Sequence, residues 1–172
     1  MKKKPTHVID IFLQPGEVYF GERETRIRTL LGSCVAITLW HPRLLIGGMC
    51  HYMLPGYRQR PKERELDGRY ADEAIQLFLR ELHKTGTKPE EYEAKLFGGG
   101  NMFPGRKPDR LFNVPDKNVD VGYQLLEMHG FRVKAKHLGG KGHRNVIFDI
   151  WSGYAWVRHQ KYILETREVD TQ

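Results

Sequence analysis

The sequence predicts an α/β protein in a single domain, and three observations support this. Its 172 residues, 40% hydrophobic and 28% charged, suffice for one soluble domain with a sizeable core. Short apolar segments bounded by glycine, proline or charge are typical of β-strands and occur toward both ends. Two further segments, 68–84 and 114–129, carry apolar residues at helical spacing. We expect residues 1–172 to form one domain, with its core at about 8–158 and peripheral charged tails.

Eight stretches are predicted to be strands, because each is a short apolar run that ends at residues typical of turns. In chain order they cover residues 8–13, 17–21, 29–40, 44–54, 94–97, 131–138, 145–150 and 154–157. The third and fourth are expected to form a hairpin, because only His41-Pro42-Arg43 separates them. A second hairpin connection is expected at Gly139–Gly142. The charged stretch Glu22–Arg28 is expected to face solvent.

The two expected helices have recognisable start and stop signals. Asp67 is a suitable N-cap for the helix at 68–84 and Gly86 a suitable stop, while the second helix stops at Gly130. The expected apolar faces are Ala71, Ala74, Ile75, Phe78 and Leu82 in the first helix, and Val121, Leu125 and Met128 in the second. The segment Pro55–Gly68, rich in proline, glycine and charge, is expected to be a mobile surface loop.

The charge of the chain bears on its partners and its location. The formal net charge is +7 and the pI about 9.4, but the basic residues in 22–28 and 58–69 alternate with Asp and Glu. This pattern disfavours nucleic acid and favours an acidic protein surface. No apolar run is long enough to insert into a membrane, and the N-terminus lacks a signal-peptide pattern. We expect a cytoplasmic protein with two free thiols.

The chemistry of the chain centres on Cys34, Cys50 and His51. A thiol near neutral pH needs a base to become a nucleophile, and a paired histidine is expected to lower its pKa. Cys50 and His51 are adjacent and point to opposite faces of a strand, so His51 can serve Cys34 but not readily Cys50. The Gly32-Ser33 pair lets the backbone turn sharply before Cys34, so the Ser33 and Cys34 N–H groups could hold an oxyanion.

Two further features of the sequence bear on this site. A third polar group would orient the imidazole, and the residues within reach by sequence are Thr29, Thr38 and Asn101. A competing arrangement uses Cys34, Cys50 and His51 with a distant His137 or His143 as zinc ligands. It lacks any paired ligand spacing such as Cys-x-x-Cys, so no metal site is expected.

Four motifs in this order resemble a known family. They are Leu30-Leu-Gly-Ser-Cys-Val-Ala36, Ile46-Gly-Gly-Met-Cys-His-Tyr-Met-Leu-Pro55, Lys95-Leu-Phe-Gly-Gly-Gly-Asn-Met-Phe103 and Leu138-Gly-Gly-Lys-Gly-His-Arg-Asn-Val-Ile-Phe-Asp149. Together they resemble the chemoreceptor glutamine deamidases of bacterial chemotaxis, the CheD family, over most of residues 27–158. The resemblance implies a mixed-sheet α/β (α+β) sandwich flanked by helices and related to cysteine-dependent toxin deamidases.

The resemblance also implies an activity, which is hydrolysis of the side-chain amide of particular chemoreceptor glutamines to glutamate and ammonia. It implies the residues of the active site as well. Cys34 matches the family's nucleophile and His51 its general base, with no metal or organic cofactor. The third family residue is a threonine on the strand before Gly-Ser-Cys. Thr29, five residues before the cysteine, is the nearest match, whereas Arg28 stands six residues before it, where some members carry the threonine.

Implied partners are methyl-accepting chemoreceptors, through their cytoplasmic helical domain, and for some members a CheC-type phosphatase. The basic loop 58–69 could help to dock a receptor. The alternative function is a non-catalytic adaptor that binds chemoreceptors or such a phosphatase.

Overall fold

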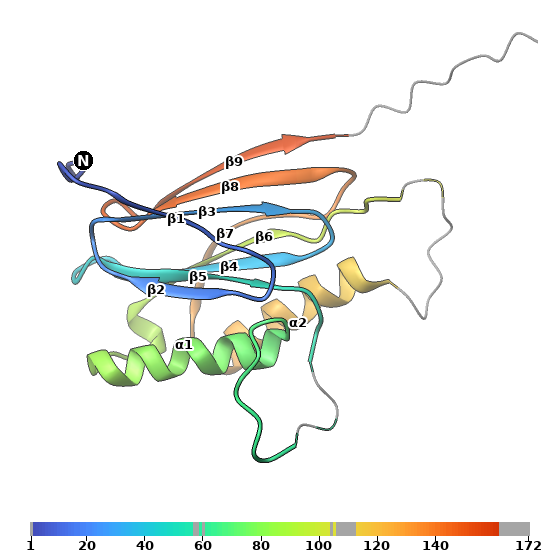
Figure 1. The fold of residues 1–172 in the computed structure, drawn as a ribbon, viewed down its shortest axis with the longest axis horizontal. Coiled ribbons are helices and arrows are strands. Elements are labelled where there is room, and N and C mark those ends of the chain that lie inside the picture. The colour runs from blue at the N-terminus through green and yellow to red at the C-terminus, as the bar shows by residue number, and fades with distance from the viewer. Residues whose placement is uncertain (1, 57–58, 60, 104, 106–112, 162–172) are drawn as a thin grey trace, which may run out of the picture.

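The computed structural model describes residues 2–56, 59, 61–103, 105 and 113–161, which form two β-sheets and two α-helices (Figure 1). The strands are β1 (Ile9–Phe12), β2 (Val18–Gly21), β3 (Thr25–Leu31), β4 (Val35–His41), β5 (Ile46–Tyr52), β6 (Glu93–Gly98), β7 (Arg132–Leu138), β8 (His143–Asp149) and β9 (Tyr154–Gln160). The helices are α1 (Ala71–Thr85) and α2 (Val114–Met128), with a short 3-10 helix at Pro89–Glu91.

These elements form three layers. One sheet has the order β1-β3-β8-β9 and the other the order β2-β5-β4-β6-β7. Both sheets are mixed, because β1 runs parallel to β3 and β6 parallel to β7, whereas the other neighbours are antiparallel. The helices cover the face of the five-stranded sheet that is turned away from the other sheet (Figure 1). The prediction of a mixed-sheet α/β sandwich flanked by helices is therefore confirmed.

Strand β4 lies at the centre of the molecule and is buried along its whole length. Its residues alternate between two cores, as the pleat of a strand requires. Ile37 and Leu39 pack with the helices, whereas Ala36 and Trp40 pack between the two sheets. The predicted hairpin of β4 and β5 is confirmed, with Ala36 paired to His51.

The predicted single strand at 29–40 is wrong, because it divides at Gly32-Ser33-Cys34 into β3 and β4 of different sheets. The charged stretch 22–28 contributes the first half of β3 instead of lying entirely at the surface. Residues of β3 alternate between buried and more exposed positions, so Ile27 is buried and Arg28 exposed. That alternation suits a sheet with one solvated face, whereas β4 is covered on both faces.

Three further predictions are corrected. Gly139–Gly142 is not a hairpin turn, because β7 pairs with β6 in one sheet and β8 with β3 and β9 in the other. Helix α1 begins at Ala71 with Tyr70 as its N-cap, and Asp67 instead bonds to Arg69. Met128 is largely exposed, because the buried stripe of α2 consists of Asn118, Gly122, Leu125 and Leu126.

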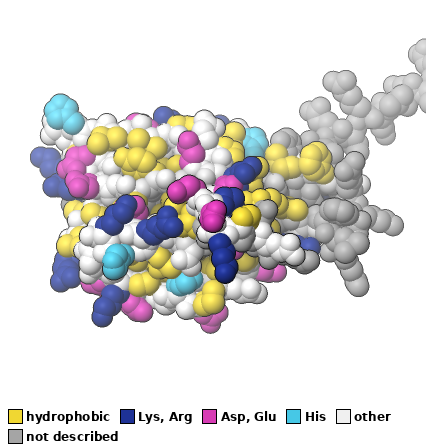
Figure 2. Space-filling model, turned by 60° about the horizontal axis from the view of Figure 1, so that its bottom comes forward, with side chains coloured by type: hydrophobic (Ala, Val, Ile, Leu, Met, Phe, Trp, Pro, Cys, Tyr) yellow, Lys and Arg dark blue, Asp and Glu magenta, His cyan; other side chains and the backbone are white. Residues whose placement is uncertain are grey.

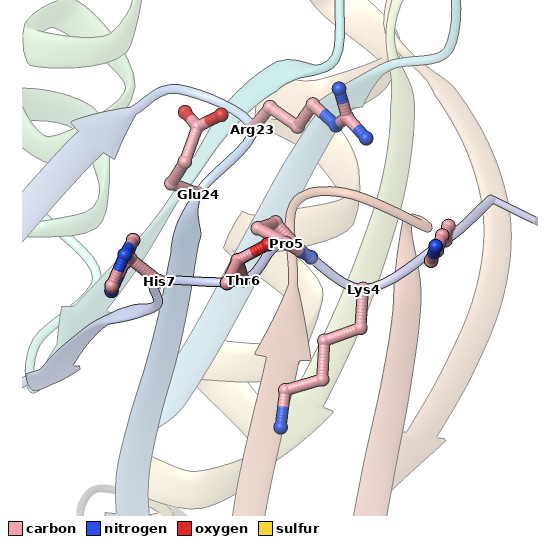
Figure 3. A pocket seen from close by; sticks show the side chains of 7 residues that line it. Lys4, Pro5, Thr6, His7, Arg23 and Glu24 are labelled. Carbon is pink, nitrogen blue, oxygen red and sulfur yellow. The ribbon is translucent and has the colours of Figure 1, made fainter.

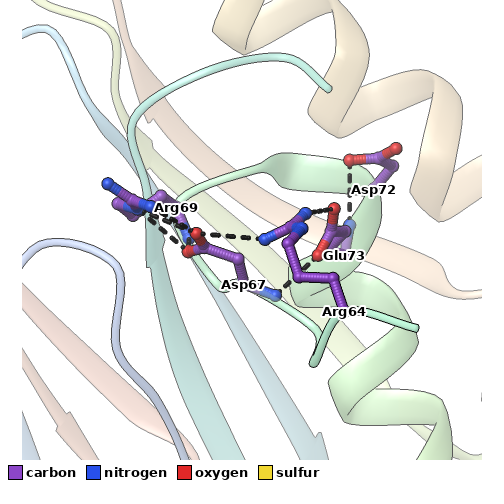
Figure 4. A network of polar contacts seen from close by, with 5 residues as sticks. All are labelled: Arg64, Asp67, Arg69, Asp72 and Glu73. Atoms are coloured by element: carbon purple, nitrogen blue, oxygen red, sulfur yellow. Dashed lines mark hydrogen bonds and ion pairs between the residues drawn. The ribbon is translucent and has the colours of Figure 1, made fainter. Parts of the chain in front are cut away.

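The described part of the loop before α1 is held by ion pairs rather than left as isolated charges (Figure 4). The buried Glu73 carboxylate accepts from the Arg64 guanidinium and from the backbone N–H of Asp67. Asp67 also pairs with Arg69, whose backbone carbonyl accepts from the N–H groups of Met53 and Leu54. The positive charges of Arg64 and Arg69 are thus partly neutralised within the loop. Residues 58 and 60 of the proposed basic docking loop at 58–69 lie outside the described residues, as does the C-terminal tail at 162–172.

Figure 2 shows Lys and Arg side chains interspersed with Asp and Glu on the face that it presents, in keeping with the alternating charges of the sequence. Within the described ranges, no helix is both long enough and apolar enough to span a membrane.

Candidate active site

Three segments that contain glycine, 32–34, 98–100 and 139–142, meet at the end of the sandwich where β3 gives way to β4 (Figure 1). The N–H of Gly100 donates to the Gly32 carbonyl and the N–H of Gly99 to the Cys34 carbonyl, both at 2.9 Å. The N–H of Gly139 in turn donates to the Gly98 carbonyl at 2.9 Å. Gly98 has a φ of +111°, and a Cβ there would lie 2.2 Å from the Cys34 carbonyl oxygen. Glycine at this position is therefore required for the close approach of the backbones.

His51 is held by Thr29 across the two sheets. The Thr29 hydroxyl donates to the Leu13 carbonyl at 2.8 Å, and its oxygen lies 2.8 Å from His51 Nδ1. A carbonyl can only accept, so the single hydroxyl hydrogen of Thr29 points to Leu13. The Thr29 oxygen must then accept from His51, which places the imidazole proton on Nδ1 and leaves Nε2 as a free base. Thr29 thus fixes both the ring orientation and the tautomer of His51.

Cys34 lies on the same side of the five-stranded sheet as His51. Ala36 pairs directly with His51, and Cys34 precedes Ala36 by two residues. Such diagonal neighbours lie about 7–8 Å apart at the backbone, within reach of a longer side chain. The Cys34 side chain packs into the core between the sheets, on the side of Ala36. No hydrogen bond joins Cys34 Sγ to the His51 ring among the described residues, and catalytic pairs commonly tighten only when substrate binds.

The electrostatics of the pair correct one expectation from the sequence. Burial raises the pKa of the Cys34 thiol above its usual value, although its own backbone N–H and the Ser33 side chain oppose this rise. Burial also lowers the pKa of His51 to about 4. The expected lowering of the thiol pKa is therefore wrong for the free protein, because desolvation outweighs the contacts that favour a thiolate. The resting pair near neutral pH is a neutral thiol beside a neutral imidazole.

The structure separates the other candidates from this pair. Cys50 is buried on the helix side of β5, and burial raises its pKa to about 12. Cys34 and Cys50 therefore lie on opposite sides of the sheet and cannot converge on one metal. Thr38 is buried further along β4, opposite Met49. The Asn101 side chain accepts from the N–H of Phe103, so its carbonyl group caps a local turn. Of the three sequence candidates, Thr29 is the residue that contacts His51.

Two buried polar residues at the site were not anticipated. Arg144 is paired in register with Leu31, next to the turn of Cys34, and its guanidinium donates to His137 Nδ1 at 2.8 Å and to the Gly139 carbonyl. Its Nη1 is buried and has no hydrogen-bond partner in the described part of the chain.

Asn118 of α2 is fully buried and donates to the Met53 carbonyl at 2.9 Å and, more weakly, to the Ser33 carbonyl at 3.4 Å. The sequence feature that indicates Asn118 is its position as the one side-chain amide in the buried stripe of α2, which consists of Asn118, Gly122, Leu125 and Leu126.

Two surface hollows of the described residues do not include the thiol–imidazole pair. One is lined by residues 3–7 with Arg23 and Glu24, at the opposite end of β3 from the turn of Cys34 (Figure 3). The other lies against Tyr123 of α2 and Lys136 of β7. Neither is lined by Cys34, His51 or Thr29, so neither bears on the thiol–imidazole pair.

Comparison with known proteins identifies the family. The family model described as "CheD chemotactic sensory transduction" matches residues 53–159. The chain belongs to the CheD family. A "Probable chemoreceptor glutamine deamidase CheD" of Pseudomonas savastanoi pv. phaseolicola is 56% identical over 91% of this chain and 88% of its own length. Its namesake in Pseudomonas syringae pv. syringae is 53% identical over 98% of this chain and 93% of its own.

The Bacillus licheniformis hypothetical protein YfiH aligns over 71% of this chain and 51% of its own, at 14% identity and a TM-score of 0.43, a likeness too slight to carry an argument.

Proposed function

We propose that this CheD protein is a protein-glutamine glutaminase, which hydrolyses the side-chain amide of particular chemoreceptor glutamines to glutamate and ammonia. The names of its relatives specify chemoreceptor glutamine deamidation. The observation that carries the proposal is the hydrogen bond between the Thr29 hydroxyl oxygen and His51 Nδ1. This bond leaves Nε2 of a neutral imidazole free to accept a proton, and the ring lies on the same side of the sheet as Cys34. A thiol next to such a base is the arrangement that acyl transfer from an amide needs.

The proposed reaction has two halves. In the first, His51 Nε2 takes the Cys34 proton as Sγ bonds to the glutamine carbonyl carbon, and the carbonyl oxygen becomes an oxyanion facing the Cys34 and Ser33 N–H groups. His51 then gives this proton to the amide nitrogen, the C–N bond breaks, and ammonia leaves a thioester on Cys34. In the second half, His51 takes a proton from water as the water oxygen attacks the thioester carbon. The C–S bond breaks, the proton returns to Cys34 and glutamate is released.

The protonation states favour concerted proton transfer in the first half. Because the pKa of His51 is lowered and that of the Cys34 thiol is raised, a resting ion pair of thiolate and imidazolium is disfavoured. The proton therefore moves as the sulfur attacks, which is general base catalysis. Neither half of the reaction requires a metal or an organic cofactor.

The partners follow from the same proposal. The substrate glutamines lie on the helical cytoplasmic domain of methyl-accepting chemoreceptors, so we infer that the protein acts in the cytoplasm. A CheC-type phosphatase is a further proposed partner. The alternative is a non-catalytic adaptor that binds receptor or phosphatase without changing either.

An assay of ammonia release tests the proposal. Purified protein is mixed with the cytoplasmic fragment of a Pseudomonas chemoreceptor, and ammonia is measured for the wild type and for Cys34→Ala. We expect release by the wild type and none above background by the variant, with the far-UV circular dichroism unchanged. Binding of the fragment without ammonia release by the wild type would support the adaptor instead.

A further inference from the structure

Asn118 of α2 ties together the two backbone segments that carry Cys34 and His51. Its Nδ2 donates to the Met53 carbonyl at 2.9 Å and to the Ser33 carbonyl at 3.4 Å. Met53 follows His51 by two residues, and Ser33 directly precedes Cys34. One amide group on the helix side of the sheet therefore holds both segments of the site.

The orientation of this amide follows from its partners. Both are carbonyl oxygens, so the NH₂ group must face them and the Oδ1 atom must face away. Oδ1 is buried and has no hydrogen-bond partner among the residues that the structure describes. An unpaired buried acceptor has a free-energy cost, which an apolar residue in this stripe of α2 would avoid. A role beyond packing is therefore indicated for Asn118.

A second contact fixes the backbone of Asn118. The Tyr52 hydroxyl donates to the Asn118 carbonyl, and Tyr52 is the neighbour of His51 in β5. A Cβ on Gly122 would lie 2.4 Å from the Tyr52 hydroxyl oxygen, so glycine at that position makes room for the contact. The part of α2 that carries Asn118 is thus attached to β5. The Asn118 side-chain amide therefore contacts the Gly32-Ser33-Cys34 turn from a rigid helix.

The carbonyls of that turn are each held by a separate donor. Gly32 accepts from the N–H of Gly100 and Cys34 from that of Gly99, whereas Ser33 accepts from the Asn118 side chain. In a trans peptide the C=O and the following N–H point in opposite directions, and no described peptide bond is cis. A Ser33 carbonyl directed at α2 therefore directs the Cys34 N–H away from α2, toward the side of the sheet that holds the Cys34 and His51 side chains.

We propose that Asn118 is a positioning residue, which aims the Cys34 N–H at the oxyanion of the tetrahedral intermediate by holding the Ser33 carbonyl. This inference rests on the proposed deamidase function and adds a residue to it. Asn118 reaches the reacting atoms only through the Ser33–Cys34 peptide. Losing an oxyanion donor typically lowers kcat about 10²- to 10³-fold, so loss of its orientation alone is expected to lower kcat about 10- to 100-fold.

The first test compares Asn118→Ala with the matched control Leu126→Ala, a fully buried residue of the same helix. Ammonia release from the Pseudomonas receptor fragment gives kcat and KM, and iodoacetamide gives the rate of Cys34 alkylation. We expect Asn118→Ala to lower kcat as stated, with KM and the alkylation rate each within about threefold of wild type, because alkylation develops no oxyanion. Leu126→Ala should be destabilised and yet retain its kcat at a temperature where it is folded.

The second test uses Asn118→Asp, which retains the size of the side chain. A carboxylate would repel the two carbonyl oxygens, whereas a neutral carboxyl group can donate to one of them, and burial favours the neutral form. The activity of Asn118→Asp relative to wild type is measured from about pH 8 down to about pH 5, which cancels the titration of the wild-type groups. We expect this ratio to rise at least threefold as the pH falls.

The outcomes separate the two proposals. With an active wild type and an inactive Cys34→Ala, a kcat of Asn118→Ala within twofold of wild type would overturn the positioning role. A proportional fall of kcat and alkylation rate would also overturn it, because the whole site would then have been lost. If Asn118→Ala does not fold, the decisive measurement is the activity of Asn118→Asp relative to wild type. A ratio that does not change with pH would then overturn the positioning role. A wild type without ammonia release would instead sink the deamidase function and the role together.

Discussion

Thr29→Val is the most informative single substitution, because valine retains the shape of threonine and removes its hydroxyl. It leaves the His51 Nδ1–H and the Leu13 carbonyl unpaired in a buried site, where the His51 side chain is about 1% exposed. Each unpaired buried group costs about 1–3 kcal/mol, so we expect the loss of both hydrogen bonds to lower the free energy of unfolding by about 2–6 kcal/mol. The same loss removes the preference for the tautomer with a free Nε2. A rise of about 1.4 kcal/mol in the activation free energy lowers the rate tenfold. We therefore expect the loss of this orientation to lower kcat about 10- to 100-fold.

The assay pairs urea unfolding with ammonia release from a receptor fragment, and Thr29→Ser is the matched control. Serine retains the hydroxyl and should restore most of the activity, although it loses a buried methyl group. Activity of Thr29→Val within twofold of wild type would refute the reasoning. Equal losses in Thr29→Ser and Thr29→Val would also refute it, since the hydroxyl would then be irrelevant.

Two further predictions concern the titration and the reactivity of the thiols. Because the pKa of His51 is lowered to about 4 and that of the Cys34 thiol is raised, both groups are predominantly neutral near neutral pH. We therefore expect kcat/KM to vary less than about threefold from about pH 5 to about pH 8, and a tenfold rise across that range would contradict the neutral resting pair. Iodoacetamide should label Cys34 faster than Cys50 near neutral pH, as peptide mapping would measure, because Cys50 is fully buried with a pKa of about 12. Equal labelling of the two thiols would show that Cys34 is not the accessible nucleophile.

Much of the site could be predicted because it depends on local periodicity. Alternation along one strand separates Cys50 from His51, and the β4–β5 hairpin then brings His51 to the side of Cys34. The contact between Thr29 and His51 was not determined by the sequence, because β3 and β5 belong to different sheets and only their packing brings the side chains together.

The missed features all depend on tertiary packing. The division of 29–40 into two strands requires knowing that its halves join different sheets, which the apolar pattern alone does not contain. Asn118 was overlooked because its importance comes from two loop carbonyls that lie far away in the sequence. The direction of the pKa shift of Cys34 likewise depends on burial between the sheets, which outweighs the neighbouring hydrogen bonds.

The most direct test of the central claim is the mass spectrum of a chemoreceptor co-expressed with this protein. With the wild type, specific glutamine-containing peptides of the receptor should gain one mass unit, as conversion to glutamate requires. With Cys34→Ala at the same expression level, those peptides should retain the mass of glutamine. Conversion by Cys34→Ala equal to that of the wild type, or no conversion by either, would contradict deamidation by the Cys34 thiol.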